Sequence, residues 1–122
     1  MNSPDDEQAL PRALTTQEIA VVTWLLENAS VMGSLQHLLT GIDQLHVVDR
    51  CECGCASVDF EIGGQSGRSH RIADAIAETP AGLKCGVILW GRADAVTGLE
   101  VYDLDPGSSS ELPPLATLRP WQ

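Results

Sequence analysis

The hydrophobic period of this chain changes near Leu45, and this change constrains the fold more than any other feature. Before that point, apolar side chains recur at helical spacing, as at Ile19, Val22, Leu25, Leu26 and Ala29. After it, apolar and acidic residues alternate in the stretch VDFEI, residues 58–62, which is typical of a strand with one face in water. Helices followed by strands predict an α+β domain.

A capping box marks the start of the first predicted helix. Thr15 and Glu18 have the spacing at which the hydroxyl accepts from the backbone amide three residues on, while the carboxylate reaches back to the cap. Ser34 is a second candidate N-cap, for a shorter helix that stops at Gly41. We therefore expect two helices in the first third of the chain.

Three further segments are expected to be extended. Residues 68–78 fit either a short helix or a strand, and we favour a strand because the flanking strands leave little room for a crossover. Residues 84–90, KCGVILW, are the most apolar run and indicate a central strand, and LEVYDL, residues 99–104, indicates a final one. The turn residues GGQSG, residues 63–67, predict a hairpin after the strand at 58–62.

The predicted architecture is two N-terminal helices packed on one face of an antiparallel β-meander of about four strands. Its expected core consists of Val58, Phe60, Ile62, Val87, Leu89 and Val101. The length of 122 residues fits one domain. We assign that domain to residues 14–105, after a flexible leader at 1–13 and before an extended Pro/Ser-rich arm at 106–122.

The charge balance argues against two classes of partner. The chain has 17 acidic and 7 basic side chains and a net charge of −10. Such a field repels phosphate backbones and anionic membranes, so we expect neither nucleic acid nor membrane as a partner. A basic protein partner is favoured electrostatically, although a merely solvated acidic surface is the more ordinary interpretation.

The location of the protein bears on the state of its thiols. The N-terminal sequence MNSPDDEQALPRA has neither the basic region nor the apolar core of a secretory signal. No apolar run approaches the roughly 20 residues that span a bilayer. We therefore expect a cytoplasmic protein, in which the four cysteines are reduced thiols or metal ligands rather than disulfides.

The stretch RCECGC, residues 50–55, carries the most unusual candidate chemistry. Cys51, Cys53 and Cys55 stand at alternate positions, and Cys85 on the central strand could supply a fourth thiolate for zinc, with His46 and His70 as alternatives. The paired C-x-x-C knuckles of structural zinc sites are missing, and buried cysteines often pack simply as small hydrophobic residues. Metal binding and simple packing both remain open.

No catalytic arrangement is evident in the sequence. Ser69, His70 and Arg71 place a nucleophile, a base and a cation side by side, but neighbouring residues on an extended chain point to opposite faces. His37 and His46 are isolated histidines that we interpret as structural. We therefore expect no enzymatic activity.

RCECGCASVDFEI, followed by GVILW and by GLEVYDL before a proline-rich tail, resembles a group of short bacterial proteins of unknown function. The resemblance covers residues 45–115 and rests on a C-G-C-x-S-V-D strand and a late G-L-E-V strand. It implies a fold and no catalytic residues. Within it, Cys53 and Cys55 belong to the motif, whereas Cys51 and Cys85 are additions.

Three functional hypotheses follow from the sequence. The first is a small acidic binding or interaction protein without catalysis. The second is a protein that binds zinc or another metal through the Cys-x-Cys-x-Cys thiolates. The third is an acidic inhibitor or immunity-type protein that neutralises a basic partner.

Overall fold

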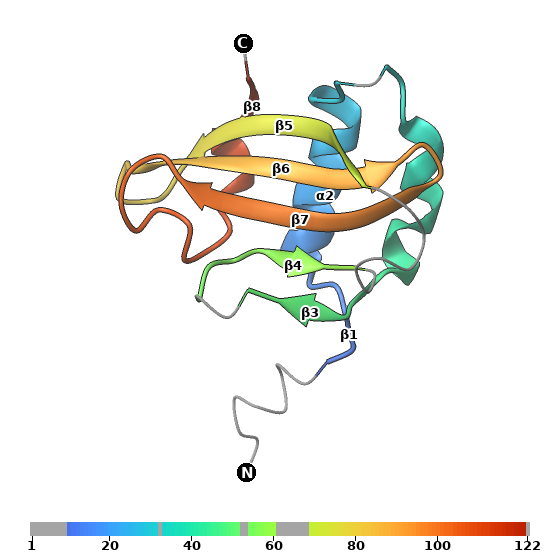
Figure 1. Ribbon diagram of the computed structural model, residues 1–122. Coiled ribbons are helices and arrows are strands. Elements are labelled where there is room, and N and C mark those ends of the chain that lie inside the picture. Colours follow the sequence, from blue (N-terminus) through green and yellow to red (C-terminus); the bar gives the residue numbers. More distant parts are fainter. Residues whose placement is uncertain (1–9, 32, 52–53, 61–68, 122) are drawn as a thin grey trace.

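The computed structural model describes residues 10–31, 33–51, 54–60 and 69–121 (Figure 1). In chain order the elements are the strand β1 (Arg12–Ala13), the helix α2 (Thr16–Asn28), the 3₁₀ helix η1 (Gln36–Gln44) and the strands β2 (His46–Val47), β3 (Asp49–Arg50), β4 (Val58–Asp59), β5 (His70–Glu78), β6 (Lys84–Arg92) and β7 (Ala95–Asp103), followed by the 3₁₀ helix η2 (Leu115–Thr117) and the strand β8 (Arg119–Pro120). The predicted mixture of helix and strand is confirmed.

The capping box at the start of α2 is present as predicted. The Glu18 backbone amide donates to Thr15 Oγ1 over 3.0 Å, and the Thr15 amide donates to Glu18 Oε1 over 2.8 Å. Arg12 adds two parallel bonds to the same carboxylate, at 2.8 and 2.9 Å. The helix then buries one apolar face against the sheet, and the residues of that face include Val21, Val22, Leu25 and Leu26.

The second predicted helix forms as a 3₁₀ helix and extends beyond Gly41 to Gln44. Leu38 and Ile42 are its buried residues. In Figure 1, α2 and η1 lie on the same face of the sheet, and no helix of the described residues covers the opposite face.

Three strands of nine residues form the centre of the sheet. β5, β6 and β7 pair antiparallel in sequence order, so the segment at 70–78 is a strand, as we favoured. The turn between β5 and β6 closes with a bond of 2.8 Å from the Gly82 amide to the Thr79 carbonyl, and Gly82 has a φ of 84°. This positive φ explains the need for glycine there.

The predicted meander of about four strands is wrong. The main sheet has six strands in the order β3-β4-β7-β6-β5-β8, and β1 and β2 form a separate two-stranded sheet. The strands missed by the prediction have only two residues each, which is too short for alternation to be recognised.

The predicted pairing after β4 is wrong as well. β4 lies beside β7 and not beside β5, so β4, β5, β6 and β7 follow a Greek-key path in place of a hairpin. Turn residues indicate where a chain bends but do not determine which strand it joins. The GGQSG segment itself lies outside the described residues.

The outer edge of β5 is covered along its length. Near its start, the Val31 amide donates to the Ile72 carbonyl and the Asp74 amide donates to the Ala29 carbonyl. Further on, β8 pairs with Ala75 and Ile76, and the Thr117 hydroxyl bonds both backbone groups of Glu78. The C-terminal arm therefore protects an edge that could otherwise pair with another chain.

The core lies between the helices and one face of the sheet. Of the six predicted core residues, Val58, Phe60, Val87, Leu89 and Val101 are buried, and Ile62 lies outside the described residues. Leu118 of the arm is buried, whereas Leu115 and Trp121 are exposed. Within the described ranges, no helix has the length and apolar character needed to cross a membrane.

Candidate functional site

The candidate site lies on the sheet face opposite α2 and η1, which we call the outer face. Alternation along β6 directs Cys85, Val87 and Leu89 into the core and Ile88 and Trp90 to the outer face, where both are only partly buried. Register places Glu100 beside Ile88, so Glu100 and Tyr102 of β7 share this face.

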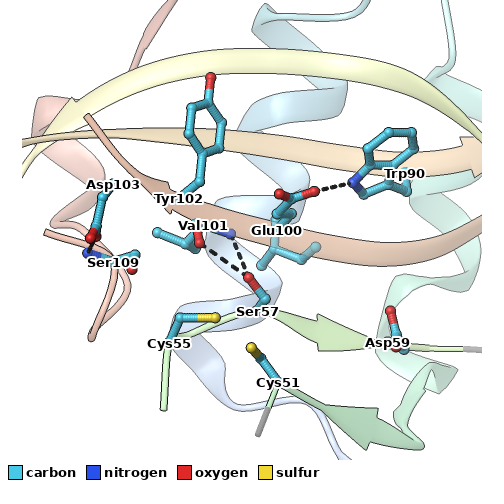
Figure 2. Close-up of a pocket in the computed structure, with 11 residues that line it drawn as sticks. Cys51, Cys55, Ser57, Asp59, Trp90, Glu100, Val101, Tyr102, Asp103 and Ser109 are labelled. Atoms are coloured by element: carbon cyan, nitrogen blue, oxygen red, sulfur yellow. Dashed lines mark hydrogen bonds between the residues drawn. The ribbon is translucent and has the colours of Figure 1, made fainter. Parts of the chain in front are cut away.

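A groove of about 460 Å³ runs along β7 on this side of the molecule (Figure 2). We call it the β7 groove. Its described lining residues come from β4 and the segment before it, from β6 and β7, and from the turn after β7: Cys51, Cys55, Ser57, Asp59, Trp90, Leu99, Glu100, Val101, Tyr102, Asp103 and Ser109.

Ser57 holds one wall of the groove against β7. Its hydroxyl accepts from the Val101 amide at 2.9 Å and donates to the Val101 carbonyl at 3.2 Å, so a side chain extends the β4–β7 pairing by one position (Figure 2). The Cys51 amide in turn donates to the Ser57 carbonyl, and the Ala56 amide donates to the Ser109 carbonyl. These bonds fix the wall at both ends.

Trp90 and Glu100 are joined across the floor of the groove. The indole Nε1–H donates to Glu100 Oε1 over 2.9 Å (Figure 2). This bond orients the indole ring and leaves Oε2 of the carboxylate available to a ligand. Both side chains are partly accessible to solvent.

Asp59, which lines one end of the groove, has a second carboxylate on the neighbouring strand. Asp49 and Asp59 are direct cross-strand partners in the β3–β4 pair. Desolvation by the surrounding protein, and then repulsion from Asp49, raise the pKa of Asp59 above its ordinary value. Like charges placed directly opposite on two strands destabilise a sheet. A bound cation would relieve this repulsion.

At the other end, Asp103 is held as a carboxylate by the turn that follows β7. The Ser109 amide donates to Oδ1 at 2.8 Å, and the Gly107 amide donates to Oδ2 at 3.1 Å. Hydrogen bonds from Ser109 and then from Gly107 keep the pKa of Asp103 below its ordinary value. Both ends of the groove are therefore acidic.

The positive charges of the chain do little to offset this acidity. Among the described residues, ion pairs join Arg12 with Glu18, Arg71 with Asp74, Arg92 with Asp94 and Arg119 with Glu78. Among the described lining residues of the β7 groove there is no Lys or Arg. The groove is a negatively charged depression with an aromatic component.

The cysteines of the predicted metal site are distributed over two places. Cys51 and Cys55 line the β7 groove, where Cys51 is disulfide-bonded and Cys55 is a free thiol. Cys85 is a fully buried free thiol on the core side of β6, and Cys53 lies outside the described residues. Within the described ranges, no three His, Cys, Asp or Glu side chains are grouped so that they could hold a metal ion. The zinc site stays a prediction.

The other residues considered for chemistry have separate partners. Ser69 Oγ bonds Thr97 Oγ1 at 2.6 Å, Arg71 pairs with Asp74, and His70 is exposed at the start of β5. His37 Nε2 lies 2.6 Å from the Ala93 carbonyl oxygen, and His46 Nδ1 lies 3.1 Å from that of Gln44. Ser69, His70 and Arg71 are not brought together with one another or with the groove.

Sequence reasoning did not identify Asp49, Trp90, Glu100 or Tyr102 as site residues. Trp90 belongs to the apolar run of β6, but it faces outward because it alternates with buried Leu89. That alternation was the available signal. The acidic pair required the β3–β4 register, which strands of two residues did not reveal.

The fold and the groove together define a small α+β protein. Its described helices cover one face of the sheet, and the other face carries an acidic groove with aromatic residues. No protein-family model matches the chain, and no curated protein and no solved structure shows significant similarity to it.

Proposed function

We propose that this protein is a non-catalytic binding protein that holds a basic segment of a partner protein in the β7 groove. The observation that carries the proposal is the charge of the groove. Asp59, Glu100 and Asp103 line it without a basic side chain among the described lining residues. Complementary charge is what steers and orients a basic partner.

The aromatic residues of the groove add to this support. Trp90 and Tyr102 lie on the open face and are partly exposed. Tryptophan, tyrosine and arginine supply much of the binding energy at protein interfaces. An inhibitor or immunity-type role is one form of this function, since it also requires tight binding to a basic protein.

The test measures binding of a fluorescein-labelled peptide of three Arg-Gly-Ser repeats by fluorescence anisotropy. We expect saturable binding that weakens as salt is raised from about 50 to about 300 mM, because salt screens the attraction between the peptide and the groove. A Glu-Gly-Ser peptide of the same length should not bind. Absence of saturable binding of the arginine peptide at 50 mM salt would overturn the proposal.

A pair of charge-matched variants separates the groove from the general acidity of the surface. The groove variant combines Asp59→Asn with Glu100→Gln. The control combines Glu27→Gln on α2 with Asp43→Asn on η1, two exposed positions on the helical side. We expect the groove variant to lose about tenfold in affinity and the control less than about twofold. Equal losses of affinity would show that peptide binding depends only on the net charge of the protein.

A further inference from the structure

We infer that the β7 groove contains a subsite for an arginine side chain, located between Asp59 and Trp90. This inference rests on the proposed function and specifies the partner group that the groove selects. It begins from the register of four neighbouring strands. Asp49 pairs with Asp59, Asp59 pairs with Gly98, and Gly98 pairs with Trp90.

Gly98 separates Asp59 from Trp90 in this row. Because it has no side chain, the row across the outer face is interrupted between Asp59 on β4 and Trp90 on β6. A Cβ placed on Gly98 would lie 3.1 Å from Asp59 Oδ1, so this carboxylate oxygen takes the room that a side chain at position 98 would need. Asp59 and Trp90, which flank Gly98 in register, both line the β7 groove (Figure 2).

Three groups around this space favour a cation. Asp59 is repelled by Asp49 and is stabilised by any positive charge brought next to it. Glu100 is held by Trp90 Nε1–H through Oε1 and offers Oε2. The indole ring is the aromatic group that attracts cations most strongly over its face.

The carboxylates and the indole favour a guanidinium group over an ammonium group. A guanidinium is planar, stacks on an aromatic face and donates in a fixed fork that matches carboxylates. An ammonium is a compact and strongly hydrated point charge that gains less from an indole face. A divalent metal is not the expected occupant, because the described residues supply no group of three ligands.

The experiment compares three peptides of equal length: the Arg-Gly-Ser peptide, its lysine counterpart and its citrulline counterpart. Citrulline keeps the shape of arginine and removes its charge. We expect the arginine peptide to bind at least about fivefold tighter than the lysine peptide. Citrulline should abolish binding.

Trp90→Leu should reduce the arginine preference to about one, and Trp90→Phe, which keeps an aromatic face, should retain part of it. Trp24→Phe is the matched control, because Trp24 lies on α2 away from the groove. Should Trp90→Leu not fold, a titration of the native protein with methylguanidinium provides the same information. Of the tryptophan indole N–H signals in a ¹⁵N spectrum, that of Trp90 should shift most, with assignment from single Trp→Phe variants.

The outcomes distinguish the two proposals. Equal, salt-dependent binding of the arginine and lysine peptides, with loss in the Asp59→Asn/Glu100→Gln variant, would overturn the arginine subsite and leave the basic-segment proposal standing. An arginine preference that survives Trp90→Leu, or a methylguanidinium titration that leaves the Trp90 signal in place, would also overturn the subsite. No binding of either peptide would overturn both.

Discussion

The ring of Tyr102 lies directly across Gly86 on the neighbouring strand. The two residues are register partners in the β6–β7 pair, and a Cβ at Gly86 would overlap the Tyr102 ring atoms. Glycine inside a strand ordinarily weakens it, but here it provides the space in which an aromatic side chain lies flat on the sheet. The contact sets the position of one aromatic wall of the β7 groove.

Gly86→Ala should therefore destabilise the protein. The new methyl group forces Tyr102 to move, and overpacking of this kind costs about 1–3 kcal/mol. Urea unfolding, monitored by circular dichroism, measures the change in the free energy of unfolding. The double variant Gly86→Ala/Tyr102→Ala should lose less stability than the sum of the two single variants, because the alanine at 102 removes the overlap. Additive losses would contradict the proposed contact.

Leu89→Ala should cost more than Gly86→Ala. Leu89 is fully buried on the core side of the central strand β6. Removing its side chain loses transfer free energy and leaves a cavity, so we expect a loss of about 2–5 kcal/mol in the free energy of unfolding. Leu104→Ala, at an exposed leucine beyond β7, is the control and should change it little. Similar losses at both positions would contradict the observed core.

These contacts show how far the sequence could predict the fold. The capping box of Thr15 and Glu18 and the apolar run of β6 are local signals, so both elements were predictable. The position of β4 beside β7 depends on contacts between distant segments, one of which is the Ser57 hydroxyl on Val101. Here a serine side chain takes the place of a backbone partner of Val101. A hydrogen bond of this kind produces no hydrophobic periodicity by which it could be predicted.

The site was less predictable than the fold for a related reason. Asp49 and Asp59 are ten positions apart and meet only because of the β3–β4 register. Trp90 and Glu100 meet only because β6 and β7 are paired. The cysteines were candidate site residues because their spacing in the sequence is unusual. The carboxylates and aromatic residues of the groove form no such motif in the sequence.

Asp59→Asn should weaken binding and at the same time stabilise the fold. The variant removes the repulsion from Asp49, which is worth about 0.2–0.5 kcal/mol after allowance for solvent screening. The gain should be largest at pH 7 and should disappear at acid pH. The reason is that the folded-state pKa of Asp59 is raised, so protonation relieves the same repulsion in the wild-type protein. Asp43→Asn, an exposed position on η1, is the control, and a loss of stability in Asp59→Asn would contradict the repulsion.

Glu18→Gln, in contrast to Asp59→Asn, should destabilise the protein at pH 7, and this loss should shrink at acid pH. Burial opposes ionisation of Glu18, but hydrogen bonds from Arg12 and Thr15 outweigh it and lower its pKa below 4.5. Its contribution to stability is therefore complete above that pH and is lost as the pH falls through the folded-state pKa. At pH 7 we expect the variant to lose about 1.5–3 kcal/mol, the range for hydrogen bonds to charged groups. The loss should shrink in urea unfolding at pH 3, whereas Glu27→Gln on the exposed side of α2 should change little at either pH.

Native alkylation should distinguish the two free thiols. Cys55 is partly exposed at the β7 groove and should react with iodoacetamide in the folded protein. Cys85 is fully buried, and burial and then the charge of Asp103 raise the pKa of its thiol, so little reactive thiolate forms. Peptide mapping should find Cys85 labelled only after unfolding in urea. Labelling of Cys85 in the native state would contradict its burial.

The same experiment separates the groove from the zinc site predicted at Cys51, Cys53, Cys55 and Cys85. A zinc ion held by these thiolates would protect Cys55 as well as Cys85, and a chelator would release both. Elemental mass spectrometry would then find about one zinc per chain, as one tetrahedral thiolate site requires. The structure favours the other outcome, because Cys51 is disulfide-bonded and Cys85 faces the core on the opposite side of the sheet. We therefore expect a Cys55 thiol that reacts at the same rate with and without chelator.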